Sequence, residues 1–232
     1  ENNEKMRQEF TANVSHELKT PLTSISGYAE LIETGIAKPE DTPGFARKIH
    51  VEASRMIQLV NDILQLSHLD NVSETGAAPA METVDLLDVA RECVERQKVN
   101  ARRSYISLTY LGESAPVTGS RVLLDELCQN LCDNAIRYNR PGGKVQIITA
   151  CTRDGHCTLT VKDNGIGIPK EAQTSVFERF YRVDKSRSKA TGGTGLGLAI
   201  VKHIARIHNA RIKLDSVVDE GTTITVIFET AS

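Results

Sequence analysis

Apolar residues recur every three or four positions along the first 70 residues, a period that predicts two long amphipathic helices. Residues 35–44 separate the helices and hold two glycines and two prolines, which end a helix and let the chain reverse. A hairpin with such long apolar stripes buries too little surface alone, so we expect a homodimer in which two hairpins form a four-helix bundle. The stripes consist of Phe10, Val14, Leu18, Leu22, Ile25, Ala29 and Ile32, then Phe45, Ile49, Ala53, Met56, Val60, Ile63 and Leu66.

The pattern changes after a small, polar segment at residues 71–82 that is typical of a linker. From residue 83 to residue 232, helical periodicity alternates with the period of strands. The sequence thus predicts a helical domain over 1–70 and a second domain over 83–232, an α+β sandwich with a mixed sheet covered by helices on one face. Helices are expected at 86–97, 121–138 and 196–208, and strands at 106–110, 144–152, 156–162, 211–217 and 222–229.

Composition narrows the functional classes. Of 232 residues, 40% are apolar and 25% are charged, which is typical of a globular protein. The net charge of −2 gives no basic excess of the kind that marks a nucleic-acid-binding protein. No run of 18 apolar residues occurs, so we expect no membrane-spanning segment within this sequence. The five cysteines lack the spacing of a structural zinc site, and Cys128 and Cys132 fit a helix core. Free thiols would indicate a reducing compartment, with the cytosol as the default.

One histidine stands out on the first predicted helix. His16 and Thr20 lie one turn apart, away from the apolar stripe, so the imidazole should face solvent. A neutral imidazole can act as a nucleophile and carry a phosphoryl group, and Glu17 beside it could take the proton of the other ring nitrogen. A threonine at position 20 excludes the zinc-protease motif, which needs histidine there. A solvated surface histidine is the alternative interpretation.

The helix predicted at 121–138 carries polar residues on the face opposite its leucines. Asn130 and Asn134 lie one turn apart, and Arg137 and Tyr138 continue the same face. Asparagine is unfavourable inside a helix unless its amide has a task, and an amide oxygen is a suitable ligand for Mg²⁺. Solvated helix asparagines are the alternative.

Two glycine-rich segments add the features of a nucleotide site, although no standard phosphate loop of the Walker A type is present. Asp163 follows a predicted strand and could accept a hydrogen bond from an adenine amino group, while Gly165 and Gly167 would let the ring approach the backbone. Residues 193–197 open a predicted helix, where backbone N–H groups suit phosphate oxygens. Each segment alone could be a plain turn.

Together these motifs resemble the catalytic core of bacterial sensor histidine kinases of the class with a HisKA-type hairpin, most similar to phosphate- and cell-wall-sensing kinases. Five segments match the H, N, G1, F and G2 boxes of that family in order and cover nearly the whole chain. They read SHELKTPL (15–22), QNLCDNAIRY (129–138), DNGIGIP (163–169), FERFYRV (177–183) and GTGLGLAI (193–200).

The resemblance implies a role for each matching residue. His16 would accept the phosphoryl group, with Glu17 as acid/base partner and Thr20 orienting water for dephosphorylation of the partner. In the ATP site, Asn130 would coordinate Mg²⁺ and Asp163 would hold the adenine amino group. The remaining nucleotide contacts would come from Asn134, Arg137, Tyr138, Gly165, Gly167, Arg182, Gly193, Gly195 and Gly197. Residues 170–195 would form a lid over the phosphates, with Phe177 and Phe180 at its base. The lid contains a run of Lys and Arg (185–189) and would become ordered when nucleotide binds. Family members often have lysine where this chain has Arg137, and the two cations differ in geometry.

The implied activity is ATP-dependent autophosphorylation of His16, phosphoryl transfer to an aspartate of a response-regulator receiver domain, and dephosphorylation of that regulator. On this interpretation residues 1–70 form the dimerisation and histidine phosphotransfer domain, and residues 83–232 the catalytic ATP-binding domain. The chain would be the cytoplasmic portion of a parent anchored in the bacterial inner or cell membrane through an upstream part. Two alternatives remain open: an ATPase clamp of the gyrase and MutL type, and a non-enzymatic dimeric scaffold that binds nucleotide.

Overall fold

A computed structural model describes residues 2–75, 79–183 and 192–229 of the chain. The chain divides into two compact units. The first comprises residues 1–65 with 192–194, and the second comprises residues 66–191 with 195–232. Within the described residues, no helix combines the length and hydropathy needed to cross a lipid bilayer.

The first unit is built on the helical hairpin. Helix α1 (Asn2–Glu33) and helix α2 (Thr42–Thr75) confirm the two amphipathic helices expected from the sequence. At the loop end, the rings of Tyr28 and Phe45 stack with centroids 5.6 Å apart. The Lys48 ammonium lies 5.2 Å from the Tyr28 ring and 5.5 Å from the Phe45 ring, so a cation–π contact joins the two helices there.

Helix α2 carries a second apolar stripe that the sequence analysis did not separate from the first. Ile57, Val60 and Leu64 are spaced at i, i+3 and i+7 and are 64%, 41% and 63% exposed. Residues at this spacing share one helix face. The hairpin therefore presents an apolar surface that its own two helices leave uncovered.

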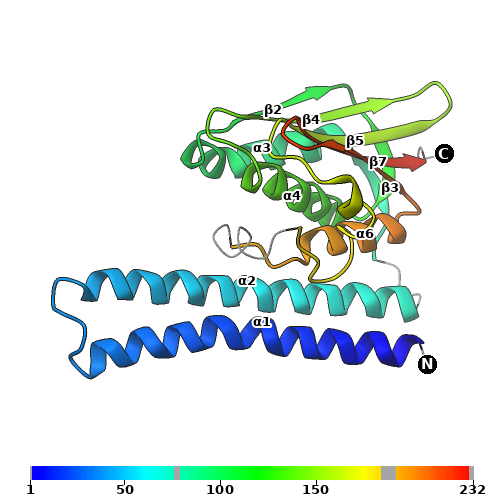
Figure 1. Ribbon diagram of the computed structural model, residues 1–232. Helices are drawn as coiled ribbons and strands as arrows, with labels where there is room; N and C mark the ends of the chain where they lie inside the picture. Colours follow the sequence, from blue (N-terminus) through cyan, green and yellow to red (C-terminus); the bar gives the residue numbers. More distant parts are fainter. Residues whose placement is uncertain (1, 76–78, 184–191, 230–232) are drawn as a thin grey trace. The chain divides into compact units, whose positions relative to one another are not determined.

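The second unit contains the remaining elements in an order that alternates helices and strands (Figure 1). They are β1 (Glu82–Asp85), α3 (Leu86–Arg103), β2 (Ser107–Gly112), β3 (Pro116–Gly119), α4 (Arg121–Arg137), β4 (Lys144–Cys151), β5 (His156–Asp163), the 3-10 helix η1 (Lys170–Ala172), α6 (Gly197–Ile207), β6 (Arg211–Val217) and β7 (Gly221–Glu229).

The described strands form a mixed five-stranded sheet in the order β2-β4-β5-β7-β6. Strands β2 and β4 are parallel, and the other neighbours are antiparallel. Helices α3, α4 and α6 lie on one side of this sheet (Figure 1). The predicted sandwich with helices on one face is thus confirmed.

The core of the second unit lies between this sheet face and the helices. Every second residue of a strand points to the same face, and the inward positions are fully or nearly fully buried aliphatic or aromatic side chains. The strands contribute Val145, Ile147, Leu159, Val161, Val226 and Phe228, and the helices contribute Leu124, Leu127, Leu131, Ile200 and Ile204. The core is almost wholly aliphatic, as expected for a chain without tryptophan.

Several local features differ from the sequence expectations. Helix α2 continues to Thr75, into the segment expected to be a linker, because the first helix-breaking residue after it is Gly76. Strands β1 and β3 form a separate two-stranded antiparallel sheet that the sequence analysis missed. The side chain of Asp85 joins them, since it caps α3 at Leu87 N and also accepts from Ala115 N, at 2.9 and 2.8 Å.

The expectation of free thiols is wrong for two of the five cysteines. Cys151 and Cys157 form a disulfide, whereas Cys93, Cys128 and Cys132 are free and buried. The pairing across the β4–β5 turn places Cys151 directly opposite Cys157, which their spacing alone did not reveal. The prediction that Cys128 and Cys132 fill the helix core is confirmed.

Candidate functional site

His16 lies on an open face of α1. Its side chain is 79% exposed, and its Nδ1 lies 3.9 Å from Oε1 of Glu17. One turn further on, the hydroxyl of Thr20 donates to the His16 carbonyl at 3.3 Å. Pro21 continues the helix without an N–H for the Glu17 carbonyl. The imidazole is therefore accessible to a reactant, with a carboxylate at hand to take a proton from Nδ1.

Asp163 has the opposite environment at the end of β5. Its Oδ1 accepts hydrogen bonds from the amide of Gly165 at 2.8 Å and from the amide of Thr222 at 3.2 Å. Burial raises the pKa of Asp163 to about 6, against the lowering effect of these two amides. The carboxylate is thus charged at neutral pH but poorly solvated. A hydrogen-bond donor such as an exocyclic amino group would offset the free-energy cost of this poor solvation.

The turn after Asp163 requires glycine for steric reasons. A side chain at Gly165 would overlap the carbonyl of Tyr138, and one at Gly167 would overlap the carbonyl of Val217. Gly167 also has a φ of 69°, which disfavours other residues. The amide of Ile166 donates to the Tyr138 carbonyl at 3.1 Å. These contacts place Gly165 and Ile166 against Tyr138 at the end of α4, and Gly167 against Val217 at the end of β6.

The polar face of α4 meets the beginning of α6. A Cβ on Gly197 would lie 3.1 Å from Oδ1 of Asn130 and 3.8 Å from Nδ2 of Asn134. The Nδ2 of Asn130 donates back to the Glu126 carbonyl at 3.0 Å. That bond fixes the amide and leaves its oxygen toward the first turn of α6, where unpaired N–H groups favour anions.

The donor set fits a magnesium ion held together with a nucleotide. In the described part of the chain, no cluster of three or more His, Cys, Asp or Glu side chains could hold a metal alone. The oriented amide oxygen of Asn130 is a hard ligand of the kind that Mg²⁺ accepts when phosphates supply the others.

A carboxylate that the sequence analysis passed over supports this face. Asp133 lies between α3 and α4, where Gln97 of α3 donates to its Oδ1. Burial raises the pKa of Asp133, and the charge of Arg137 one turn away lowers it. Asp133 and Arg137 thus carry opposite charges one turn apart on α4, and the signal for this in the sequence is their i,i+4 spacing.

The segment around Phe180 is tied to the second glycine-rich loop. The Phe180 amide donates to the Gly195 carbonyl at 2.9 Å, and a Cβ on Gly195 would lie 3.2 Å from Nε of Arg182. Phe180 has a φ of 62°, which is uncommon for a bulky residue and indicates a backbone held by its surroundings. Phe177 is half-buried nearby in sequence.

Most of the predicted nucleotide residues thus belong to the second unit, whereas the predicted phosphoacceptor belongs to the first. Asn130, Asn134 and Gly197 meet, and Gly195 meets Arg182. His16, Glu17 and Thr20 belong to the first unit, as does Gly193. The expected charged run at 185–189 lies outside the described residues.

The chain carries an exposed histidine on a helical hairpin, followed in sequence by an α/β unit with a carboxylate beside two glycines. This combination defines the class of two-domain protein kinase cores that phosphorylate a histidine. Two family models match accordingly. The "His Kinase A (phospho-acceptor) domain" matches residues 6–72, and the "Histidine kinase-, DNA gyrase B-, and HSP90-like ATPase" matches residues 119–232. The chain belongs to the sensor histidine kinase family, and its second unit is an ATP-binding domain of that type.

Named relatives agree with this assignment. The sensor-like histidine kinase SenX3 of Mycolicibacterium smegmatis is 44% identical over 228 residues, covering 96% of this chain and 57% of that protein. The sensor protein kinase WalK of Staphylococcus haemolyticus is 41% identical, covering 95% of this chain and 36% of that protein. This chain therefore spans only part of the length of these relatives.

A solved structure supports the fold independently. The histidine kinase ThkA, in complex with the response regulator protein TrrA, superposes with a TM-score of 0.76 at 22% identity, covering 99% of this chain and 64% of that one. At this identity the likeness establishes the arrangement of elements rather than the chemistry.

Proposed function

We propose that this chain phosphorylates its own His16 with ATP and passes the phosphoryl group to an aspartate of a response regulator. One observation carries the proposal: an exposed histidine with a carboxylate 3.9 Å from its Nδ1 stands on a helix of a sensor histidine kinase. A nucleophile must be reachable, and the adjacent carboxylate distinguishes His16 from a plain solvated histidine.

The phosphoryl step follows from the two ring nitrogens. Glu17 accepts the proton of Nδ1, and Nε2 attacks the γ-phosphorus in line with the bridging oxygen. A P–N bond forms, the P–O bond to the β-phosphate breaks, and ADP leaves. When bound, Mg²⁺ would neutralise the phosphate charge, with Asn130 among its ligands.

The binding residues follow from the contacts within the second unit. Asp163 would receive the adenine amino group on Oδ2, because both of its amide hydrogen bonds go to Oδ1. Gly165 and Gly167 would line the base pocket. The phosphates would contact Asn134, Arg137, Tyr138 and Arg182, and the loop glycines Gly193, Gly195 and Gly197 would cover them.

The functional form would be a homodimer. The stripe of Ile57, Val60 and Leu64 is too apolar and too exposed for a face that stays in water. A second hairpin with the same stripe would cover it in a four-helix bundle. Residues 1–70 would serve dimerisation and phosphotransfer, 71–82 linkage and 83–232 ATP binding.

The partner would be a receiver domain that docks on the hairpin and takes the phosphoryl group from His16. Thr20 would orient water when the same surface dephosphorylates that partner, since its hydroxyl lies one turn from the histidine. The parent protein would be anchored in the membrane through a part outside this chain.

The experiment is incubation with γ-labelled ATP and Mg²⁺, using the wild type, His16→Gln and His50→Gln. His50 is a matched control because it is also an exposed histidine of the hairpin. We expect acid-labile, alkali-stable label in the wild type and in His50→Gln and none in His16→Gln. ATP hydrolysis without a phosphoprotein would favour a gyrase- or MutL-type clamp, and nucleotide binding without either reaction would favour a scaffold.

A further inference from the structure

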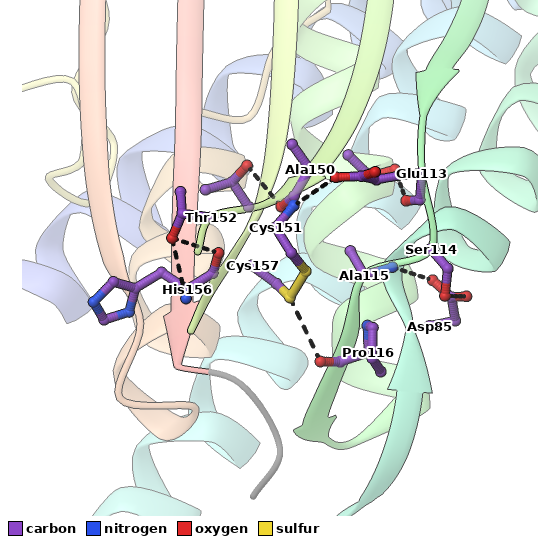
Figure 2. The surroundings of a disulfide bond; sticks show 12 residues. Asp85, Glu113, Ser114, Ala115, Pro116, Ala150, Cys151, Thr152, His156 and Cys157 are labelled. Atoms are coloured by element: carbon purple, nitrogen blue, oxygen red, sulfur yellow. Dashed lines mark hydrogen bonds between the residues drawn. A yellow bond between two sulfur atoms is a disulfide. The ribbon is translucent and has the colours of Figure 1, made fainter. Parts of the chain in front are cut away.

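The five cysteines fall into two groups with different chemistry. Cys93, Cys128 and Cys132 are fully buried free thiols on α3 and α4. Cys151 ends β4, Cys157 follows the start of β5, and a disulfide joins them directly across the antiparallel pair (Figure 2). None of these residues takes part in the phosphoryl chemistry described above.

The disulfide lies at the turn end of the β4–β5 hairpin, away from Asp163, the carboxylate proposed to bind the nucleotide. Cys157 and Asp163 are six residues apart on the same strand, which corresponds to roughly 20 Å at the rise of an antiparallel strand. The bond therefore acts on the β4–β5 hairpin and not on a nucleotide contact.

The two sulfurs differ in access. Cys157 is fully buried, whereas Cys151 is only half-buried at the last position of β4. An incoming small thiol would reach the sulfur of Cys151, with Cys157 as the leaving group. In the reverse direction, a small disulfide would react with Cys151, and Cys157 would resolve the adduct, which is the arrangement of reversible thiol sites.

The surroundings also suit the reduced state. Sγ of Cys157 lies 3.7 Å from the carbonyl oxygen of Pro116 (Figure 2). A disulfide sulfur carries no hydrogen, but a thiol can donate to this carbonyl. Breaking the bond would therefore create a hydrogen bond for Cys157 rather than leave a buried polar group without one.

The hairpin is also held by contacts that do not involve sulfur. The Thr152 amide donates to the His156 carbonyl at 2.7 Å, and the His156 amide donates to the Thr152 hydroxyl at 3.3 Å. The Cys151 amide donates to Oε1 of Glu113 at 3.4 Å (Figure 2). Cleavage would loosen the turn without removing the strand pairing.

We propose that Cys151 is a site of reversible thiol modification, with Cys157 as its resolving partner, through which low-molecular-weight thiols and disulfides tie and untie the β4–β5 hairpin. A thiolate attacks Sγ of Cys151, the disulfide breaks, and Cys157 leaves as a thiolate that takes a proton. A second thiol then releases Cys151. The net reaction converts two small thiols and the protein disulfide into one small disulfide and the protein dithiol. A small disulfide such as oxidised glutathione drives the reverse.

The first test uses the wild-type chain in glutathione buffers of stepped ratio, with acid quenching and intact-mass analysis. We expect the disulfide to open and reform without denaturant, and the reduced protein to take one maleimide label quickly, at Cys151. Opening should lower the melting temperature of the second unit by about 5–10 °C. A bond that opens only in denaturant, or rapid labelling of a core cysteine, would overturn the proposal.

A matched pair of variants tests the division of roles. Cys157→Ser should form one adduct with oxidised glutathione, at Cys151, whereas Cys151→Ser should form none because Cys157 is buried. Adduct on Cys151→Ser, or none on Cys157→Ser, would contradict the assignment. Both readouts are masses and are independent of kinase activity, so failure of the proposed kinase reaction would not affect them.

Discussion

The hairpin and the α/β unit place their key side chains in opposite environments. The His16 side chain is 79% exposed, with a carboxylate 3.9 Å from its Nδ1. Asp163 is half-buried, and two backbone amides donate to its carboxylate. A nucleophile must be free to meet a phosphorus atom, whereas a recognition carboxylate must already be in place when the nucleotide arrives.

This difference has a practical consequence. Substitutions on the open helix should change the reaction while leaving nucleotide affinity and stability intact. Substitutions of the glycines in the turn after Asp163 should change nucleotide affinity and stability together, because the same backbone contacts build both the site and the fold.

The largest effect is expected at Gly167. Its φ is 69° and an added Cβ would overlap the Val217 carbonyl, whereas Gly142 has a φ of 83° with nothing nearby. Gly167→Ala should therefore lower the free energy of unfolding by about 3 kcal/mol, against about 1 kcal/mol for Gly142→Ala. Urea unfolding and titration with a fluorescent ATP analogue measure both quantities. Equal losses in the two variants would show that the close contact is unimportant.

Asp163→Asn should weaken ATP binding by about 10- to 100-fold, because it replaces a charged acceptor of a hydrogen bond with a neutral one. The amide oxygen can still accept from Gly165 and Thr222, so the turn should stay folded. Calorimetric titration gives the affinity. Unchanged affinity would remove Asp163 from adenine recognition.

The raised pKa of Asp163, about 6 against 3.8 for the free group, gives a pH signature with two opposite signs. ATP affinity should weaken as the pH falls through about 6, because the carboxylate gains a proton. The contribution of Asp163 to the stability of the ligand-free protein should be fully present below 3.8 and lost as the pH rises through about 6. The wild type minus Asp163→Asn difference isolates both trends. A difference that does not vary between pH 4 and 7 would contradict the assigned pKa.

Ile57→Asp tests the open apolar stripe of the hairpin. A charge in the middle of a buried dimer contact should weaken self-association by about 100-fold or more. Sedimentation equilibrium gives the result. A dimer that survives Ile57→Asp would place the interface elsewhere.

The smallest effect is expected at Thr20. Thr20→Ala should change the free energy of unfolding by less than about 0.5 kcal/mol. It should leave autophosphorylation of His16 unchanged and slow the dephosphorylation of the regulator. Thr23→Ala is the control, because its hydroxyl makes the same kind of helix bond, to the Lys19 carbonyl at 2.8 Å. Release of inorganic phosphate from a phosphorylated receiver domain measures the effect. Equal slowing of both reactions would exclude a water-orienting role.

Local signals in the sequence predicted the long elements. The helical periods of α1, α2 and α4 and the turn residues between β4 and β5 act over a few positions, so they can be read directly. The clustering of Asp163 with its glycines was also local.

Features made by distant contacts could not be predicted. Strands β1 and β3 are four residues each and gain their identity only by pairing. The role of Asp133 depends on Gln97, 36 positions away. The disulfide depended on the register of β4 against β5, which no single residue specifies.

The most direct measurement of the central claim is site-localising mass spectrometry at neutral pH after a brief incubation with ATP and Mg²⁺. We expect one phosphoryl group on His16 and none on Ser15 or Thr20. Phosphate on either hydroxyl, or an unmodified His16 while ATP is consumed, would contradict it.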